Sequence, residues 1–167
     1  MTDTERTSTL ERLMREYGND IKRFCTLQLR DTFQAEDAAQ DTFVRAWKAL
    51  DTFRNEGSEK AWLMRIAVNI CRDYQRTGWF RHTDRRVTPD SLPEQGQEAA
   101  FPDGEVSRAV TSLPAKLRMT VLLRYYQGMT IGETADALGV SHATAKRQLK
   151  KANEVLRRKL EGWYNDD

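Results

Sequence analysis

Apolar residues recur every three or four positions along most of this chain, and no segment shows the strict alternation typical of a half-buried strand. One apolar stripe extends from Leu10 to Cys25, and Gly18-Asn19 within it predicts a break in the helix. Further stripes extend over residues 35–50 and 62–74. The spacing therefore predicts an all-α fold.

The helical period stops at residues 78–104. Together with Thr77, this stretch holds three of the four prolines and three of the nine glycines, which predicts a flexible linker. Helical spacing resumes at about Glu105, and Ser112 is the expected cap of a helix that begins near Pro114 and continues to Gly128. We therefore expect two small helical domains, at residues 9–77 and 105–163.

Cys25 and Cys71 lie among apolar helical positions without C-x-x-C spacing, so we expect buried, reduced thiols. No apolar run approaches the roughly 20 residues that span a bilayer. The N-terminal residues are polar, without an apolar signal core. These features predict a protein that stays in the cytoplasm.

The residues around Gly139 have the features of a helix-turn-helix. Thr130 and Glu133 form a Thr-x-x-Glu capping box that begins one short helix. Gly139 can adopt the left-handed conformation that ends it. Val140 supplies an apolar plug in the turn, and Ser141 caps the next helix. Together these signals predict a DNA-binding pair of helices.

The second of these helices has an apolar stripe from Ala145 to Leu156 and a basic face elsewhere. Between Ser141 and Leu160 there are seven basic residues and one acidic residue, as a major-groove helix requires. Early side chains, including Gln148, are expected to reach base edges, and later lysines phosphates. The predicted DNA contacts are Ser141, His142, Thr144, Lys146, Arg147, Lys150 and Lys151.

Acidic and amide side chains gather on one arc of the predicted helix at residues 35–50: Glu36, Asp37, Gln40 and Asp41. No basic residue occurs from Asp31 to Asp41. An acidic arc repels phosphate, so it is more suited to a protein partner. The next helical segment instead mixes aromatic, amide and arginine side chains, which suits unpaired bases and the nucleic-acid backbone.

These segments resemble the extracytoplasmic-function (ECF) group of the bacterial sigma-70 family over nearly the whole chain. AEDAAQDTF (residues 35–43) and WLMRIAVN (62–69) are similar to the family's region two. ADALGVS (135–141) and ATAKRQLKKA (143–152) are similar to region four. The resemblance implies an RNA polymerase sigma factor that places the polymerase at promoters and initiates transcription.

The resemblance also implies roles for individual residues. Glu36, Asp37, Gln40 and Asp41 would bind the core polymerase, and residues 117–126 would meet its flap tip. Asn69 would recognise a flipped-out base of the minus-ten element, and the basic helix would recognise the minus-thirty-five element. The residues expected at the minus-ten element are Phe53, Arg54, Asn55, Trp62, Arg65, Asn69, Arg72 and Arg76.

Core RNA polymerase and promoter DNA are thus the expected partners, and the resemblance adds an anti-sigma factor, often membrane-anchored. We expect no catalytic activity, metal, cofactor or small-molecule substrate, because no P-loop, dinucleotide fingerprint, GxSxG or HExxH motif occurs. Two alternatives stay open. One is a regulator that binds duplex DNA alone as a dimer, and the other is a metal-dependent hydrolase built on Asp37 and Asp41.

Overall fold

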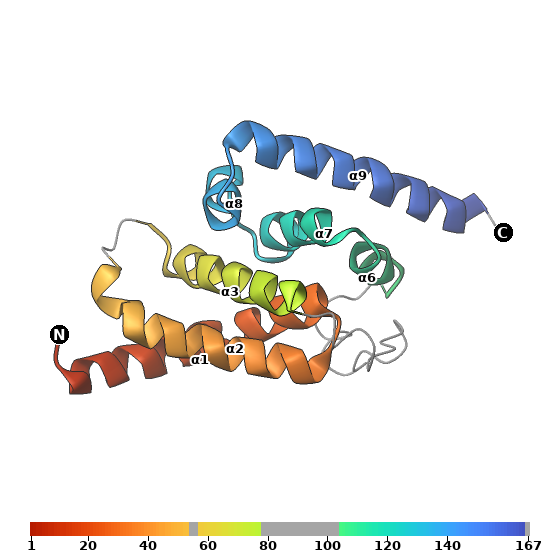
Figure 1. The fold of residues 1–167 in the computed structure, drawn as a ribbon. Coiled ribbons are helices and arrows are strands. Elements are labelled where there is room, and N and C mark those ends of the chain that lie inside the picture. Colours follow the sequence, from red (N-terminus) through yellow and green to blue (C-terminus); the bar gives the residue numbers. More distant parts are fainter. Residues whose placement is uncertain (54–56, 78–103, 166–167) are drawn as a thin grey trace. The chain divides into compact units, whose positions relative to one another are not determined.

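The computed structural model describes residues 1–53, 57–77 and 104–165 (Figure 1). Every regular element within these ranges is a helix, which confirms the predicted all-α class. The chain divides into two compact units, residues 1–86 and 87–167, and each is described by itself. The predicted linker lies outside the described residues except for Gly104, which instead begins a helix.

The first helix, α1 (Asp3–Leu29), starts earlier than the apolar stripe indicated. Thr2 accepts a hydrogen bond from the Glu5 N–H (3.2 Å), and the Glu5 carboxylate accepts one from the Thr2 N–H (2.9 Å). The predicted break near Gly18 and Asn19 is wrong, because α1 is continuous there. A helical glycine costs about 1 kcal/mol, less than the burial of one large side chain such as Ile21 contributes.

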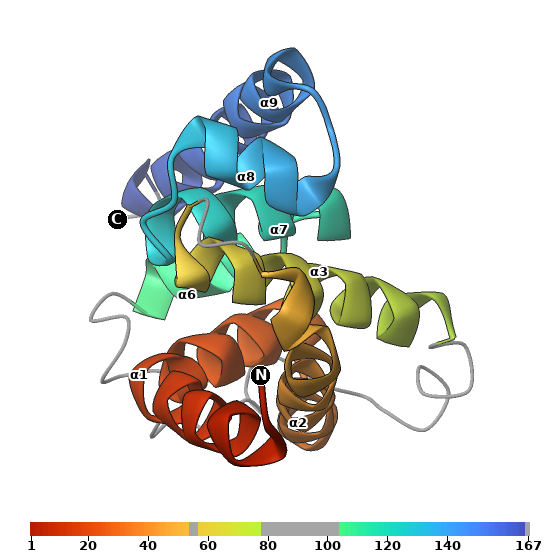
Figure 2. The same cartoon turned by 90° about the vertical axis from the view of Figure 1, so that its left-hand side faces the viewer.

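Two further helices complete the first unit: α2 (Thr32–Ala49) and α3 (Glu59–Arg76). Arg30 ends α1 in the left-handed conformation (φ 59°), and Asp31 caps α2 by accepting a hydrogen bond from the Gln34 N–H (3.0 Å). The short 3-10 turn η1 (Leu50–Thr52) follows α2. All three α-helices pack against one another (Figures 1 and 2).

Small and large apolar side chains share the core of this unit. Alanines on α2 and α3 are fully buried, and their size allows the helices to approach closely: Ala35, Ala38, Ala46 and Ala67. The stripe predicted for α3 is partly wrong, because Trp62 and Tyr74 are only half-buried, whereas Leu63, Met64 and Val68 are buried. A helix that packs against two neighbours buries more than a single stripe.

Cys25 on α1 and Cys71 on α3 are both buried and form no disulfide, with their Sγ atoms 3.8 Å apart. This confirms the expectation of buried, reduced thiols. At that separation they pack as small apolar side chains between the helices.

Glu59, the first residue of α3, is bound to α1. Arg12 donates two hydrogen bonds to its carboxylate (3.0 and 2.5 Å), and the Tyr17 hydroxyl donates a longer one (3.4 Å). The Arg12 guanidinium, chiefly through these hydrogen bonds, lowers the pKa of Glu59 below its ordinary value of 4.5. The ion pair therefore joins the beginning of α3 to α1.

Replacing Glu59 with glutamine is expected to lower the free energy of unfolding of the first unit by about 1 kcal/mol at pH 7, because the pair is partly exposed. A depressed pKa stabilises the fold above the unfolded-state value and loses that effect as pH falls. The difference between wild type and Glu59→Gln should therefore be constant at neutral pH and shrink below pH 4.5. Urea titrations of both proteins at several pH values measure this difference. A difference that widens on acidification would contradict the prediction.

The second unit contains α6 (Gly104–Thr111), α7 (Ala115–Val121), the π-helical turn η3 (Leu122–Tyr126), α8 (Ile131–Leu138) and α9 (His142–Asn165). The helices α6, α7 and α8 each pack against α9. The helical segment predicted to end at Gly128 does so, and Gly128 adopts a left-handed conformation (φ 66°). The π turn within it was not anticipated.

Ser112 does not cap α7 as the sequence predicted. Its hydroxyl donates to the Ala109 carbonyl (2.7 Å), and Pro114 occupies the cap position without a side-chain hydrogen bond. The buried Arg118 donates to the carbonyls of Thr111 and Leu113 (3.2 and 3.0 Å). Arg118 thereby satisfies backbone acceptors where α6 ends.

Candidate functional site

The turn between α8 and α9 has the geometry that the sequence predicted. The Thr130 hydroxyl accepts from the Glu133 N–H (3.1 Å), and the Glu133 carboxylate accepts from the Thr130 N–H (3.0 Å). Gly139 is left-handed (φ 69°), and Ser141 caps α9 by accepting from the Thr144 N–H (3.1 Å). The helix-turn-helix is thus fixed by hydrogen bonds at both helix starts.

The two faces of α9 differ as expected. Ala145 and Ala152 are fully buried, and Leu149 and Leu156 are half-buried beside them. The opposite face exposes Lys146, Arg147, Lys150, Lys151, Arg157 and Arg158, and His142 is exposed at the start of the helix. Such a surface suits the phosphates and base edges of duplex DNA.

Polar side chains near the start of α9 have different surroundings. Ser141 donates to the Thr144 hydroxyl (3.0 Å), which also accepts from Arg147 (3.1 Å). Gln148, expected at the base edges, instead accepts a hydrogen bond from Thr120 on α7 (3.0 Å). The hydroxyls therefore order the first turn, and Gln148 is directed toward α7.

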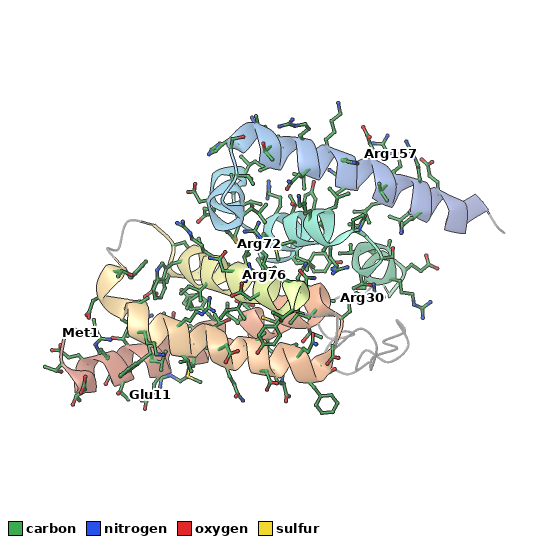
Figure 3. The ribbon with its side chains drawn as sticks, in the orientation of Figure 1. Met1, Glu11, Arg30, Arg72, Arg76 and Arg157 are labelled. Atoms are coloured by element: carbon green, nitrogen blue, oxygen red, sulfur yellow. The ribbon has the colours of Figure 1, made fainter. Side chains whose placement is uncertain are left out.

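A stripe of polar and basic side chains runs along α3. Its members fall at alternating intervals of three and four residues: Trp62, Arg65, Asn69, Arg72 and Arg76. All but the half-buried Trp62 are exposed (Figure 3 labels Arg72 and Arg76). The structure thus brings these predicted minus-ten residues onto one face.

An aromatic pair lies where this stripe begins. The rings of Phe53 and Trp62 have centroids 5.0 Å apart with an interplanar angle of 40°. The pair provides an apolar platform beside the first turn of α3, of the kind on which bases stack. Arg54 and Asn55, also expected at the minus-ten element, lie outside the described residues.

The acidic arc on α2 is exposed, but its four members are not equivalent. Glu36 pairs with Lys22 (3.3 Å), and Asp41 accepts a hydrogen bond from the Tyr74 hydroxyl (2.6 Å). The side chains of Asp37 and Gln40 have no hydrogen bond or ion pair to any residue in the described part of the chain. These two side chains are therefore the members of the arc that can bind a partner without first breaking an interaction within the described residues.

Two apolar side chains that sequence reasoning missed flank this arc. Phe33 is 79% exposed and Val44 is 52% exposed. They lie four residues before Asp37 and four after Gln40, and thus on the same side of α2. Their helical spacing from Asp37 and Gln40, which places them on the acidic side of the helix, was the signal that could have identified them. Exposed apolar residues on an acidic surface favour a protein partner over nucleic acid.

Within the described residues, no group of three His, Cys, Asp or Glu side chains is placed to hold a metal ion. None of the described helices is both long enough and apolar enough to cross a membrane.

The fold and these surfaces define a helix-turn-helix DNA-binding protein with a second helical unit. Residues 13–81 match sigma-70 region 2, and residues 103–154 match sigma-70 region 4. The ECF RNA polymerase sigma factor SigM of Mycobacterium tuberculosis is 31% identical over 156 residues, covering 93% of this chain and 78% of SigM. The chain belongs to the ECF sigma factors of the sigma-70 family, and therefore directs RNA polymerase to promoters as a transcription initiation factor.

Other relatives agree with this assignment. SigX of Bacillus subtilis is 28% identical over 172 residues, covering 92% of this chain and 84% of SigX. The structure of CnrH in complex with the cytosolic domain of CnrY has a TM-score of 0.70 and 25% identity, covering 93% of this chain and 90% of that one. The structure of the sigma factor RpoE in complex with the anti-sigma factor NepR from Bartonella quintana matches the fold, with a TM-score of 0.76 and 22% identity. The match covers 90% of this chain and 96% of that one.

Proposed function

We propose that three surfaces of this sigma factor divide promoter recognition among them. The basic face of α9 binds the duplex minus-thirty-five element, the stripe on α3 binds the unpaired minus-ten strand, and the arc on α2 binds core polymerase. The observation that carries this proposal is the placement of the two DNA-suited faces in separate compact units. Core polymerase, bound through the arc on α2, would hold both units on one promoter.

The α3 stripe suits a melted strand because of its chemistry. A base in a duplex hides its Watson–Crick edge, and extruding it costs a few kcal/mol. Asn69 carries a donor and an acceptor for that edge, and Arg65, Arg72 and Arg76 can hold the backbone. The Phe53–Trp62 pair offers a stacking surface at the beginning of the same stripe. Capture of the unpaired base offsets the cost of extruding it.

Polymerase should strengthen promoter binding by about 100-fold or more, because linking two weak contacts raises their combined affinity by that order. The test uses DNA upstream of start sites mapped by RNA sequencing after overexpression of the chain. Binding of the full chain to labelled fragments is measured with and without core polymerase, and a scrambled fragment is the control. Tight, sequence-specific binding without polymerase would instead establish a duplex-binding regulator.

We further propose an anti-sigma partner for this chain, by analogy with RpoE, which was solved in complex with the anti-sigma factor NepR. Binding across α2, α3 or α9 would block polymerase or promoter, and a membrane-anchored partner would hold the chain at the membrane. We assign the chain no covalent chemistry, and place its activity in the cytoplasm, where polymerase and chromosome are.

A further inference from the structure

The imidazole of His142, the first residue of α9, lies against the backbone of Gly132 in α8. A Cβ atom at residue 132 would lie 3.2 Å from Cε1 and 3.4 Å from Nε2 of His142, and 3.8 Å from the Thr130 Oγ1. Non-bonded carbon atoms prefer separations of about 3.5–4.0 Å. A side chain at residue 132 would therefore require the His142 ring to shift by a few tenths of an ångström.

The backbone around this contact has little freedom to yield. The Thr130–Glu133 capping box fixes the start of α8, and Ser141 fixes the start of α9. The Val140 N–H donates to the Ala135 carbonyl across the turn (3.0 Å). A side chain at residue 132 would consequently displace the exposed imidazole and leave the helices in place.

We propose that Gly132 is a positioning residue for promoter recognition: because it has no side chain, the ring of His142 can lie against α8, from where it donates a hydrogen bond to a base-edge acceptor in the minus-thirty-five element. This inference rests on the proposed function of α9. The first residues of a recognition helix are those that meet base edges in the major groove. A ring displaced from this position would meet the base edges differently, which changes the preference between bases.

A purely structural role for Gly132 gives a different expectation. Gly132 is the second residue of α8, and glycine is a poor helix former, so Gly132→Ala by itself favours the helix. The thermal midpoint of unfolding of the Gly132→Ala variant should therefore equal or exceed that of the wild type. Gly162→Ala is the matched control, because Gly162 lies in α9 and a Cβ atom there would meet no other described atom within 4 Å beyond its chain neighbours and the backbone of its own helix.

The experiment is a double-mutant cycle with Gly132→Ala, His142→Ala and the double variant, each as full chain with core polymerase. Binding is measured on promoters that carry every single-base change in the minus-thirty-five element. His142→Ala should reduce the preference at one position by about 3- to 10-fold, the value of one hydrogen bond. Gly132→Ala should alter the preference at that same position, and should have no further effect when His142 is absent.

Several results would overturn this proposal. One is an equal effect of Gly132→Ala with and without His142, and another is no effect of Gly132→Ala on base preference. A uniform loss of affinity on all sequences would assign His142 to a phosphate. If Lys146→Ala and Arg147→Ala change base preference but His142→Ala does not, this inference fails and the α9 interface stands. If none of these three alanine substitutions changes the base preference, the proposed α9 interface itself fails.

Discussion

Asn69→Ala should slow the formation of open promoter complexes by about 10-fold or more, because a well-placed base contact contributes about 1–3 kcal/mol. Asn69 is exposed in the middle of the α3 stripe, so its removal should leave the core of the first unit intact. Affinity for core polymerase should therefore not change. Stopped-flow fluorescence of a labelled minus-ten element measures opening, and a binding titration with core polymerase measures docking.

Asn19→Ala is the matched control, since Asn19 is an exposed helical amide on α1, away from the α3 stripe in the sequence. It should leave promoter opening at the wild-type rate. Normal opening by the Asn69 variant would refute the assigned role. If the Asn69 variant lost both polymerase binding and promoter opening, Asn69 would serve docking or folding instead.

Asp37→Arg should weaken binding to core polymerase by about 30-fold, corresponding to about 2 kcal/mol for a charge reversal at a protein interface. The Asp37 carboxylate is exposed on α2 and has no intramolecular partner within the described residues. The reversal therefore breaks no ion pair there, and the thermal midpoint should change little. Fluorescence anisotropy of labelled chain titrated with core polymerase measures the affinity, and the loss should be larger at low salt.

Glu11→Arg makes the same change in charge at an exposed position of α1 (Figure 3) and serves as the control. It should bind core polymerase nearly as wild type does. Equal losses for the two variants would mean that net charge alone governs association. Unchanged affinity and transcription for Asp37→Arg would remove the docking role from the α2 arc.

Local signals in the sequence predicted much of the second unit correctly. The Thr130–Glu133 box, the left-handed Gly139 and the Ser141 cap each depend on residues within a few positions of one another. The same kind of signal was present but overlooked at Thr2 and Glu5, where α1 begins. Short-range hydrogen bonds of this kind are set by side-chain type and spacing, so they can be recognised without a structure.

The errors arose where packing outweighs local preference. Gly18 predicted a break, yet the buried side chains on both sides of it keep α1 continuous. Ser112 was expected to cap a helix, but its hydroxyl donates a hydrogen bond to a carbonyl within α6. Tertiary burial contributes more than a cap or a single propensity, and its partners are distant in sequence.

By itself the sequence determined the helical class, the helix-turn-helix and the basic face of α9, because periodicity and capping are local properties. Only the tertiary structure decided which exposed groups have partners. The pairs Lys22–Glu36 and Tyr74–Asp41 join different helices and leave Asp37 and Gln40 available. The contact of His142 with Gly132 likewise exists only because two fixed helices cross there, and such distances are set by packing that no local pattern encodes.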